Sequence, residues 1–305
     1  MNDHFPLRRA RGGRVLCGLL VCAALLAACT GATAKDRGWT IHDPQWSALP
    51  QSTAQATAAR TRAMAIARAL GIRGEPSAVR RERDMMAGID YDLVEFLSAA
   101  GESAQMRLDP ETHAPISVVR LGPPDPSEPA VVNASNAAGR ARAVAQSLGL
   151  PAGAEPSSVK WDDAFGAWAV SWTRSIDGHP ALGDGVEVDL TRGGRVKAVT
   201  ATTTPSAPAP ANPIPSERAA ELATAIATER AWTAKPDYAR GDPELVWVRA
   251  NNFWEPAKPD APEALLRLAW SVRFSFVAIA GDEPHVIVLW FSAADGSVLG
   301  GNETA

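Results

Sequence analysis

One stretch of the chain concentrates the residue types that could do chemistry. It holds His179 between a glycine and a proline, with Asp177, Asp184, Glu187 and Asp189 close by in the sequence. An imidazole beside carboxylates could contact a ligand, and carboxylate oxygens could bind calcium. The simpler interpretation, which we favour, is an exposed turn at His179, a turn at Asp184-Gly185, and the solvent side of a strand at Glu187 and Asp189.

Sequence motifs predict no catalytic centre, metal site or cofactor. No histidine begins a His-Glu-x-x-His motif, and no two histidines after residue 28 lie within five positions of each other. No Gly-x-Ser-x-Gly elbow is present, and no glycine-rich phosphate loop follows a predicted strand. We therefore expect a protein that is not an enzyme.

Tryptophan is the unusual component of the chain, which contains ten of them. Core packing is the simplest use of so many indoles, but tryptophans that line a sheet face would serve as binding anchors. The candidate binding surface consists of Trp168, Trp172, His179, Asp184, Trp270 and Trp290.

The N-terminus combines a basic segment with a short apolar run. Four arginines between positions 8 and 14 precede an apolar run over 15–28, which is too short to span a bilayer comfortably. The run ends in Leu26-Ala27-Ala28-Cys29, which resembles a lipobox, so we expect lipidation at Cys29. An ordinary secretory peptide is the alternative. The residues after Arg8-Arg9 do not favour a twin-arginine signal, which leaves the general secretory route.

Lipidation would place the chain in the bacterial cell envelope, facing the periplasm. Thr30 after the cysteine indicates the outer membrane by the sorting rule of enterobacterial lipoproteins. Residues 1–28 contain four arginines and one aspartate, so their removal changes the net charge from −4 to −7. An acidic chain without basic runs argues against a nucleic-acid partner. The expected membrane contact is the lipid on Cys29, and Cys29 is also the only thiol that remains.

Internal repetition is the strongest sign of organisation. Residues 62–72 match residues 140–150, and both segments read as helices that stop at a glycine. Their small apolar residues recur at helical spacing, as in Ala63, Ile66, Ala67 and Leu70, which predicts one narrow buried stripe. Residues 75–80 then match 155–160, and a weaker third helical stripe begins at Ala219.

Proline-rich segments over 122–129 and 205–215 favour extended spacers between consecutive units. The expected organisation is a signal peptide (1–28), a lipidated tether (29–52), a divergent first unit (53–122), a second unit (135–203), a linker (204–215) and a third unit (216–305) with an insertion over 235–263. Alternation of apolar and polar residues predicts strands, most clearly over 268–276 and 168–172.

The second unit resembles a known family. Its residues 177–189, followed by Gly194-Arg195-Val196, are similar to the PepSY and fungalysin/thermolysin-propeptide type of domain. In that family a strand with Trp leads to a Gly-x-Pro-Val-x-Gly turn, a Val-x-Val strand and Asp-x-x-x-Gly-x-Val. The third unit repeats the closing part over 286–299, whereas the first unit lacks the glycine in 109–116.

This resemblance implies a non-catalytic module. The expected fold class is α+β, with tandem cystatin/PepSY-like units, each a helix packed across an antiparallel sheet of three to four strands. The expected function is binding or regulation of another periplasmic or outer-membrane protein, or of a peptide, through a sheet face or an edge strand. The alternative is a structural or carrier lipoprotein that holds a small apolar or peptidic ligand in a Trp-lined cavity.

Overall fold

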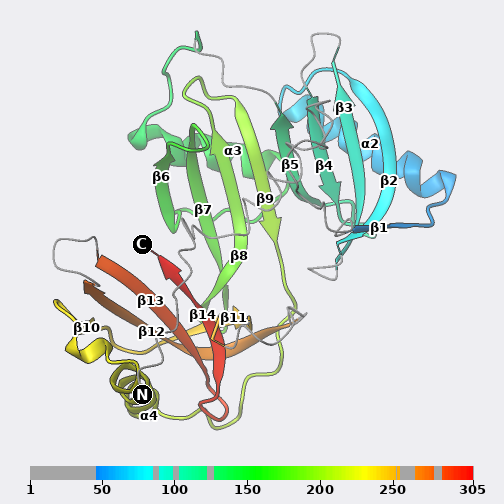
Figure 1. Ribbon diagram of the computed structural model, residues 1–305. Coiled ribbons are helices and arrows are strands. Elements are labelled where there is room, and N and C mark those ends of the chain that lie inside the picture. The colour runs from blue at the N-terminus through cyan, green and yellow to red at the C-terminus, as the bar shows by residue number, and fades with distance from the viewer. Residues whose placement is uncertain are drawn as a thin grey trace, which may run out of the picture. The chain divides into compact units, whose positions relative to one another are not determined.

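A computed structural model describes residues 46–84, 89–98, 103–121, 127–251, 253–254, 265–277 and 284–304. The chain forms two compact units (Figure 1). One comprises Asp43–Pro205, and the other contains Ser206–Ala305. The expected signal peptide and the lipidation site at Cys29 lie outside the described residues.

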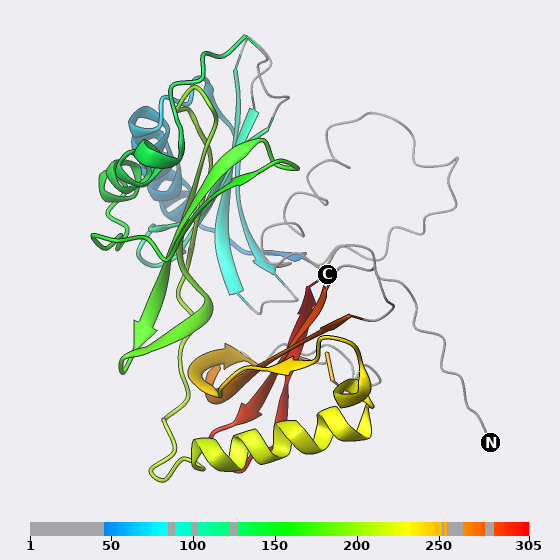
Figure 2. The ribbon, with the colours of Figure 1, turned by 90° about the vertical axis from the view of Figure 1, so that its left-hand side faces the viewer.

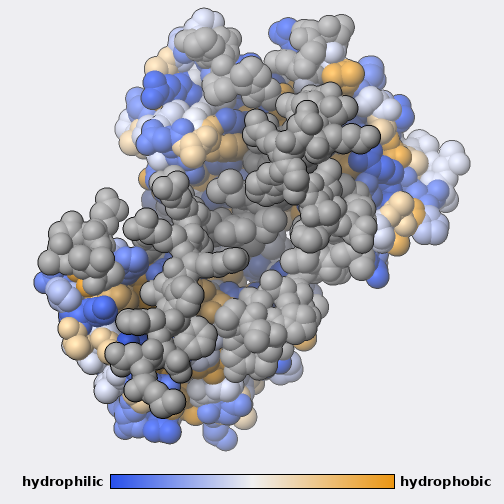
Figure 3. All heavy atoms as spheres, viewed as in Figure 1, coloured by the Kyte–Doolittle hydropathy of each residue, from blue (hydrophilic) through white to orange (hydrophobic). Residues whose placement is uncertain are grey.

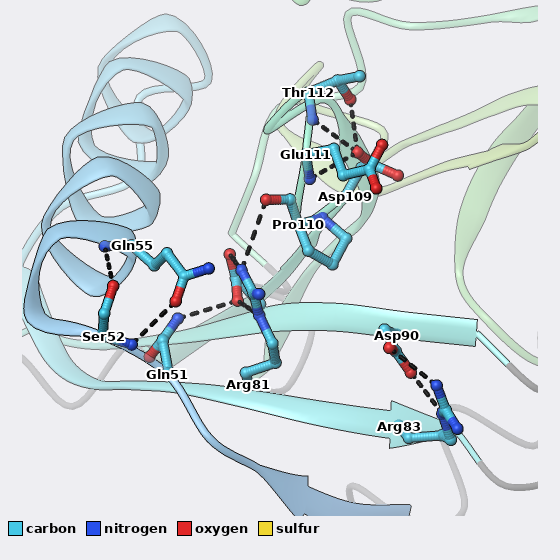
Figure 4. Close-up of polar contacts among 11 residues, drawn as sticks. Gln51, Ser52, Gln55, Arg81, Arg83, Asp90, Asp109, Pro110, Glu111 and Thr112 are labelled. Atoms are coloured by element: carbon cyan, nitrogen blue, oxygen red, sulfur yellow. Dashed lines mark hydrogen bonds and ion pairs between the residues drawn. The ribbon is translucent and has the colours of Figure 1, made fainter.

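Two helices of the first unit begin at well-defined caps and end at glycines. Helix α2 (Thr53–Ala69) starts at a capping box in which Ser52 and Gln55 exchange hydrogen bonds (Figure 4). Helix α3 (Ala134–Ser147) starts at an equivalent box built by Asn133. Gly71 and Gly149 follow with φ angles of 62° and 76°, a left-handed conformation that glycine adopts without strain. The helices and glycine stops predicted from the repeat are confirmed.

The first unit is organised around one antiparallel sheet. Its strands are β1 (Trp46–Leu49), β2 (Glu75–Asp84), β3 (Ile89–Leu97), β4 (Ser103–Leu108), β5 (Pro115–Leu121), β6 (Ser158–Asp162), β7 (Ala167–Ile176), β8 (His179–Leu190) and β9 (Val196–Thr202). Their order across the sheet is β1-β2-β3-β4-β5-β9-β8-β7-β6. Strands β1 and β6 therefore lie at its two ends.

The expected fold class is wrong, and the pairing of β5 with β9 shows why. Ser117 pairs with Thr200 and Val119 with Ala198, so the first two expected units share one continuous sheet. Of the described residues, 46% lie in strands and 21% in helices, with only three α-helices. The protein is mainly β rather than an α+β series of tandem cystatin/PepSY-like units. An edge strand exposes unpaired backbone groups, and joining the two sheets edge to edge satisfies them.

One hydrophobic core unites the two halves of this sheet. Both helices pack on the same face, with α2 over β2, β3 and β4 and α3 over β6, β7 and β8 (Figures 1 and 2). The core combines fully buried alanines of both helices, such as Ala63 and Ala141, with strand residues such as Val94 and Val188. Alanine side chains allow the helices to lie close to the strands. The opposite face of the sheet is called the helix-free face below.

The second unit is a smaller curled sheet with one long helix. Its elements are α4 (Ser216–Glu229), a 3-10 turn η2 (Trp232–Ala234), β10 (Ala239–Arg240), β11 (Glu244–Arg249), β12 (Leu266–Val277), β13 (Pro284–Ser292) and β14 (Val298–Thr304). The strands pair in the order β11-β12-β13-β14, and β10 also pairs with β12. The segment expected as an insertion over 235–263 thus supplies β10 and β11.

Asn251 joins the two ends of this curled sheet. It follows β11, yet its side chain exchanges two hydrogen bonds with the backbone of Gly301 in β14, at 2.9 and 3.0 Å. A Cβ atom at Gly300 would lie 2.0 Å from the Asn251 side-chain oxygen, so this approach requires glycine. Asn251 therefore occupies backbone groups that an edge strand would otherwise expose.

Candidate functional site

Trp168 and Trp172 contribute to the core rather than to an open surface. Both lie on the helix-covered side of β7, where Trp172 is buried and Trp168 packs against the same core. Their indole N–H groups donate to backbone carbonyls, Trp168 to Val132 at 3.2 Å and Trp172 to Gly153 at 3.1 Å. The rings of these two indoles pack in the core and their N–H groups are bonded within the fold, so both have a structural role.

Trp270 and Trp290 lie on neighbouring strands but on opposite faces of the second unit's sheet. Trp270 packs in the core beneath α4 and donates to the carbonyl of Ile214 at 2.9 Å. Trp290 packs with Val246 and other residues on the other face, and its buried N–H finds no partner among the described residues. The two indoles therefore do not form one binding surface.

The two polar members of the candidate surface also lie apart. His179 follows a tight Asp177-Gly178 turn, in which both residues have positive φ angles, and pairs with Ile176 across the hairpin. Asp184 lies further along β8, inside a strand rather than in the expected turn, and is buried. Its carboxylate accepts hydrogen bonds from the Thr204 backbone and hydroxyl and from Arg174. Asp184 thus anchors the chain where it leaves the first unit.

The carboxyl of Asp189, which was expected on the solvent side of a strand, is instead buried on the helix-free face. Asp189 alternates with the core residues Val186 and Val188 on β8, so it lies on the opposite face, yet it is only 8% exposed. No described residue donates a hydrogen bond to it or forms an ion pair with it. Alternation along β8 predicts a solvent-facing residue here, and no local sequence signal reveals its burial.

Burial and neighbouring charges make Asp189 a weak acid. Desolvation by burial raises the pKa of Asp189 to about 8, and the carboxylates of Glu187 and Asp162 act in the same direction. Lys197 acts in the opposite direction but does not cancel these effects. The carboxyl is therefore protonated at neutral pH and can bind and release a proton in the mildly alkaline range.

The fully buried carboxylate of Asp92, by contrast, has several partners. Asp92 is 0% exposed and accepts hydrogen bonds from Arg81 at 2.8 and 3.1 Å and from Gln51 at 2.9 Å. Arg81 also donates to the carbonyl of Pro110 in the turn between β4 and β5, and Asp109 caps that same turn (Figure 4). This network ties the residue before the N-cap of α2 to strands β2 and β3 and to the β4–β5 turn, and it is structural.

Edge strand β6 combines open backbone with a partly exposed indole. Among the described residues, β6 pairs only with β7 (Figure 1). Trp161 on this strand meets Trp168 edge to face, with ring centroids 5.6 Å apart, and the Arg192 guanidinium lies 4.7 Å from the centre of its ring. Its N–H donates to Asp163 at 2.7 Å. The indole is thereby held in place at the end of the sheet.

Neither a metal cluster nor a broad apolar patch appears in the described part of the chain. No three His, Cys, Asp or Glu residues there lie close enough together to hold a metal ion. Large exposed apolar side chains occur singly, at Ile89, Leu97, Val131, Leu182 and Leu265. Figure 3 likewise shows hydrophobic and hydrophilic residues interspersed over the described surface in view. A hollow of about 600 Å³ between α4 and Arg240 contains no tryptophan.

Comparisons with known proteins identify no family. No protein-family model matches the sequence. No curated protein matches it either. A crystal structure of an uncharacterized protein from Eubacterium rectale covers 78% of this chain and 80% of its own, with 7% sequence identity and a TM-score of 0.37. The PepSY resemblance stays a prediction.

No helix within the described ranges is long and apolar enough to cross a membrane.

Proposed function

We propose that this chain is a lipid-anchored, non-enzymatic protein of the bacterial cell envelope that binds an extended segment of another envelope protein. The anchor is the lipid on Cys29, supported by the charged segment, the apolar run and the small residues that precede it. Outer-membrane placement follows from Thr30. The binding role is supported by edge strand β6, which is the observation that carries the proposal.

Strand β6 suits the addition of a partner strand. A sheet edge displays backbone donors and acceptors in a row, and an extended peptide can pair with them. At the end of the second unit's sheet, Asn251 already occupies Gly301 of β14, whereas no described residue pairs with the outer side of β6. The β6 edge can therefore accept a partner strand, whereas the β14 edge is already bonded to Asn251.

Trp161 supplies a side-chain anchor beside this edge. Tryptophan combines a large apolar area with few rotatable bonds, which makes it effective at the centre of an interface. Contacts with Trp168, Arg192 and Asp163 fix its position before a partner arrives. Because scattered single apolar residues do not make a docking patch, we expect recognition to rely on main-chain pairing together with this one anchor.

Site-specific photo-crosslinking in intact cells tests the binding mode. A photoreactive amino acid at Lys160, an exposed position of β6, is expected to capture one defined envelope protein. The matched control places the same group at Gln146, an exposed position of α3 in the same unit. Capture from both positions, or from neither, would contradict recognition at the β6 edge.

Substitution of the proposed lipidation site tests the anchor. Cys29→Ala removes the thiol that would carry the lipid, so the protein is expected to move from the membrane fraction to the soluble periplasmic fraction. Immunoblots of fractionated cells measure this change. Cys22→Ala, which lies within the expected leader, is the control and should leave fractionation unchanged. Retention of the Cys29→Ala protein in the membrane fraction would overturn the anchor.

A carrier role has less support. It needs a cavity lined by tryptophans, but the N–H groups of Trp168, Trp172 and Trp270 are all bonded to backbone carbonyls within the fold. Native mass spectrometry of the purified protein distinguishes the two roles, because a carrier would retain a bound small molecule.

A further inference from the structure

Strand β6 presents a different side chain chemistry on each of its two faces. Val159 pairs with the core residue Val170 of β7, so the side chains of Val159 and Trp161 lie on the helix-covered face. Lys160 stands between them, and its side chain therefore lies on the helix-free face. Along this edge a cation thus stands midway between two apolar residues.

The two apolar side chains of this edge are only partly buried. Val159 packs against the core of the first unit, and Trp161 meets Trp168 edge to face. Both retain an exposed part, and no described strand lies on the outer side of β6 to cover it (Figure 1). Residues that face each other across neighbouring strands lie about 4.5–5.5 Å apart. Apolar residues of a partner strand at these two positions would therefore remove the remaining apolar area from water.

Lys160 is an exposed cation, and its ammonium has no ion pair or hydrogen bond among the described residues. Its cross-strand neighbour on β7 is the uncharged Ala169. Asp162 shares the same face of β6, where it accepts a hydrogen bond from the backbone of Phe165 at 3.0 Å and holds the β6–β7 turn. The charge on Lys160 is thus available to a partner at the edge.

Distance decides which charge a partner residue opposite Lys160 would meet. Such a residue lies directly across from the lysine but only diagonally from Asp162, at about 7–8 Å. Because the interaction of two charges weakens with distance, the nearer lysine determines the preference. This position therefore favours a carboxylate.

We propose that the β6 edge recognises an extended segment in which one acidic residue stands between two apolar residues. This inference rests on the proposed function, since it specifies the partner of the same edge. The acidic residue lies opposite Lys160, and the apolar residues lie beside Val159 and Trp161. Because the lysine stands midway between the two apolar residues, the same pattern applies to a parallel and to an antiparallel partner strand.

A second copy of β6 does not satisfy this pattern. In the fully overlapped antiparallel pairing of two β6 strands, Lys160 would lie opposite its own counterpart, and like charges directly opposite each other destabilise a sheet. Lysine at a sheet edge is one of the devices that prevent such self-association. Lys160 thus disfavours this pairing while it favours an acidic segment.

Panning of a phage-displayed library of random nine-residue peptides on the purified full-length protein tests the pattern. Peptides enriched on the wild type are expected to carry Asp or Glu between two apolar residues. Lys160→Glu reverses the charge, so this variant should enrich Lys or Arg at the central position instead. Lys235→Glu makes the same change at an exposed lysine of the second unit and is the control, which should keep the acidic pattern. An unchanged pattern on the Lys160→Glu protein would overturn the inference.

Fluorescence anisotropy measures the size of the preference, with one enriched peptide and its counterpart that has lysine in place of the acidic residue. The wild type is expected to bind the acidic peptide roughly five- to tenfold more tightly, because an attraction in one complex becomes a repulsion in the other. Lys160→Glu should invert this ratio. Equal affinities of the wild type for the two peptides would contradict recognition by charge.

Photo-crosslinking at position 160 tests edge binding separately from the acidic pattern. The photoreactive group is neutral, so it removes the attraction without adding a repulsion and lowers the affinity only about threefold. Capture from this position together with a failed charge reversal would overturn the pattern and leave binding at the β6 edge in place. Absence of both capture and enriched peptides would overturn the two proposals together. A wild-type dimer in sedimentation velocity that the peptide does not dissociate would show that a second copy occupies the edge, and would also overturn the inference.

Discussion

Asp92→Ala is expected to destabilise the first unit by about 3–5 kcal/mol, because it removes one partner of a buried ion pair. The Asp92 side chain is 0% exposed and that of Arg81 is 14% exposed, so the guanidinium would be left without compensation. Gln51 would lose its acceptor as well. Urea denaturation followed by far-ultraviolet circular dichroism measures the loss as a lower transition midpoint.

Asp90→Ala is a matched control on the same strand. Asp90 receives two hydrogen bonds from Arg83, at 2.5 and 3.0 Å, in the same two-point geometry as the buried pair (Figure 4). The Asp90 side chain, however, is 35% exposed and that of Arg83 48% exposed. Exposed pairs contribute at most about 1 kcal/mol, so the control should change little. An equal decrease in the free energy of unfolding of the two variants would show that burial does not determine how much these ion pairs stabilise the protein.

Local sequence signals predict the elements of this fold well. The stripe of Ala63, Ile66 and Ala67 is buried in α2, and the glycine predicted to end the helix does so with a left-handed backbone. Alternation over 268–276 is confirmed in β12, where Val272, Phe274 and Phe276 face the core beneath α4. These features depend only on residues a few positions apart, and periodicity over such short distances predicts helices, strands and their buried faces.

Long-range partners were not predictable in the same way. The pairing of β5 with β9 joins Ser117 to Thr200, and alternation shows which face of a strand is buried but not which strand lies beside it. Asp92 and Arg81 become a pair only because β2 and β3 are aligned. The candidate surface likewise combined tryptophans whose positions in the sequence fit an aromatic face, although Trp270 and Trp290 lie on opposite faces.

Asp189→Asn is expected to stabilise the protein, by an amount that depends on pH. The pKa of Asp189 is about 8 in the folded chain, against an ordinary value of about 4 for an unfolded aspartate. Between these two values the unfolded state has lost the proton and the folded state has kept it. Each pH unit in this window therefore lowers the free energy of unfolding by about 1.4 kcal/mol, and asparagine removes this dependence.

The variant should accordingly match the wild type near pH 4 and exceed it by about 2–4 kcal/mol at pH 7, with no further divergence above about pH 8. Urea denaturation at a series of pH values measures the difference. Glu155→Gln, at an exposed position of the same unit, is the control and should differ from the wild type by less than about 0.5 kcal/mol throughout. An Asp189→Asn protein that is less stable than the wild type at pH 7 would show that the carboxylate is charged and paired in the fold.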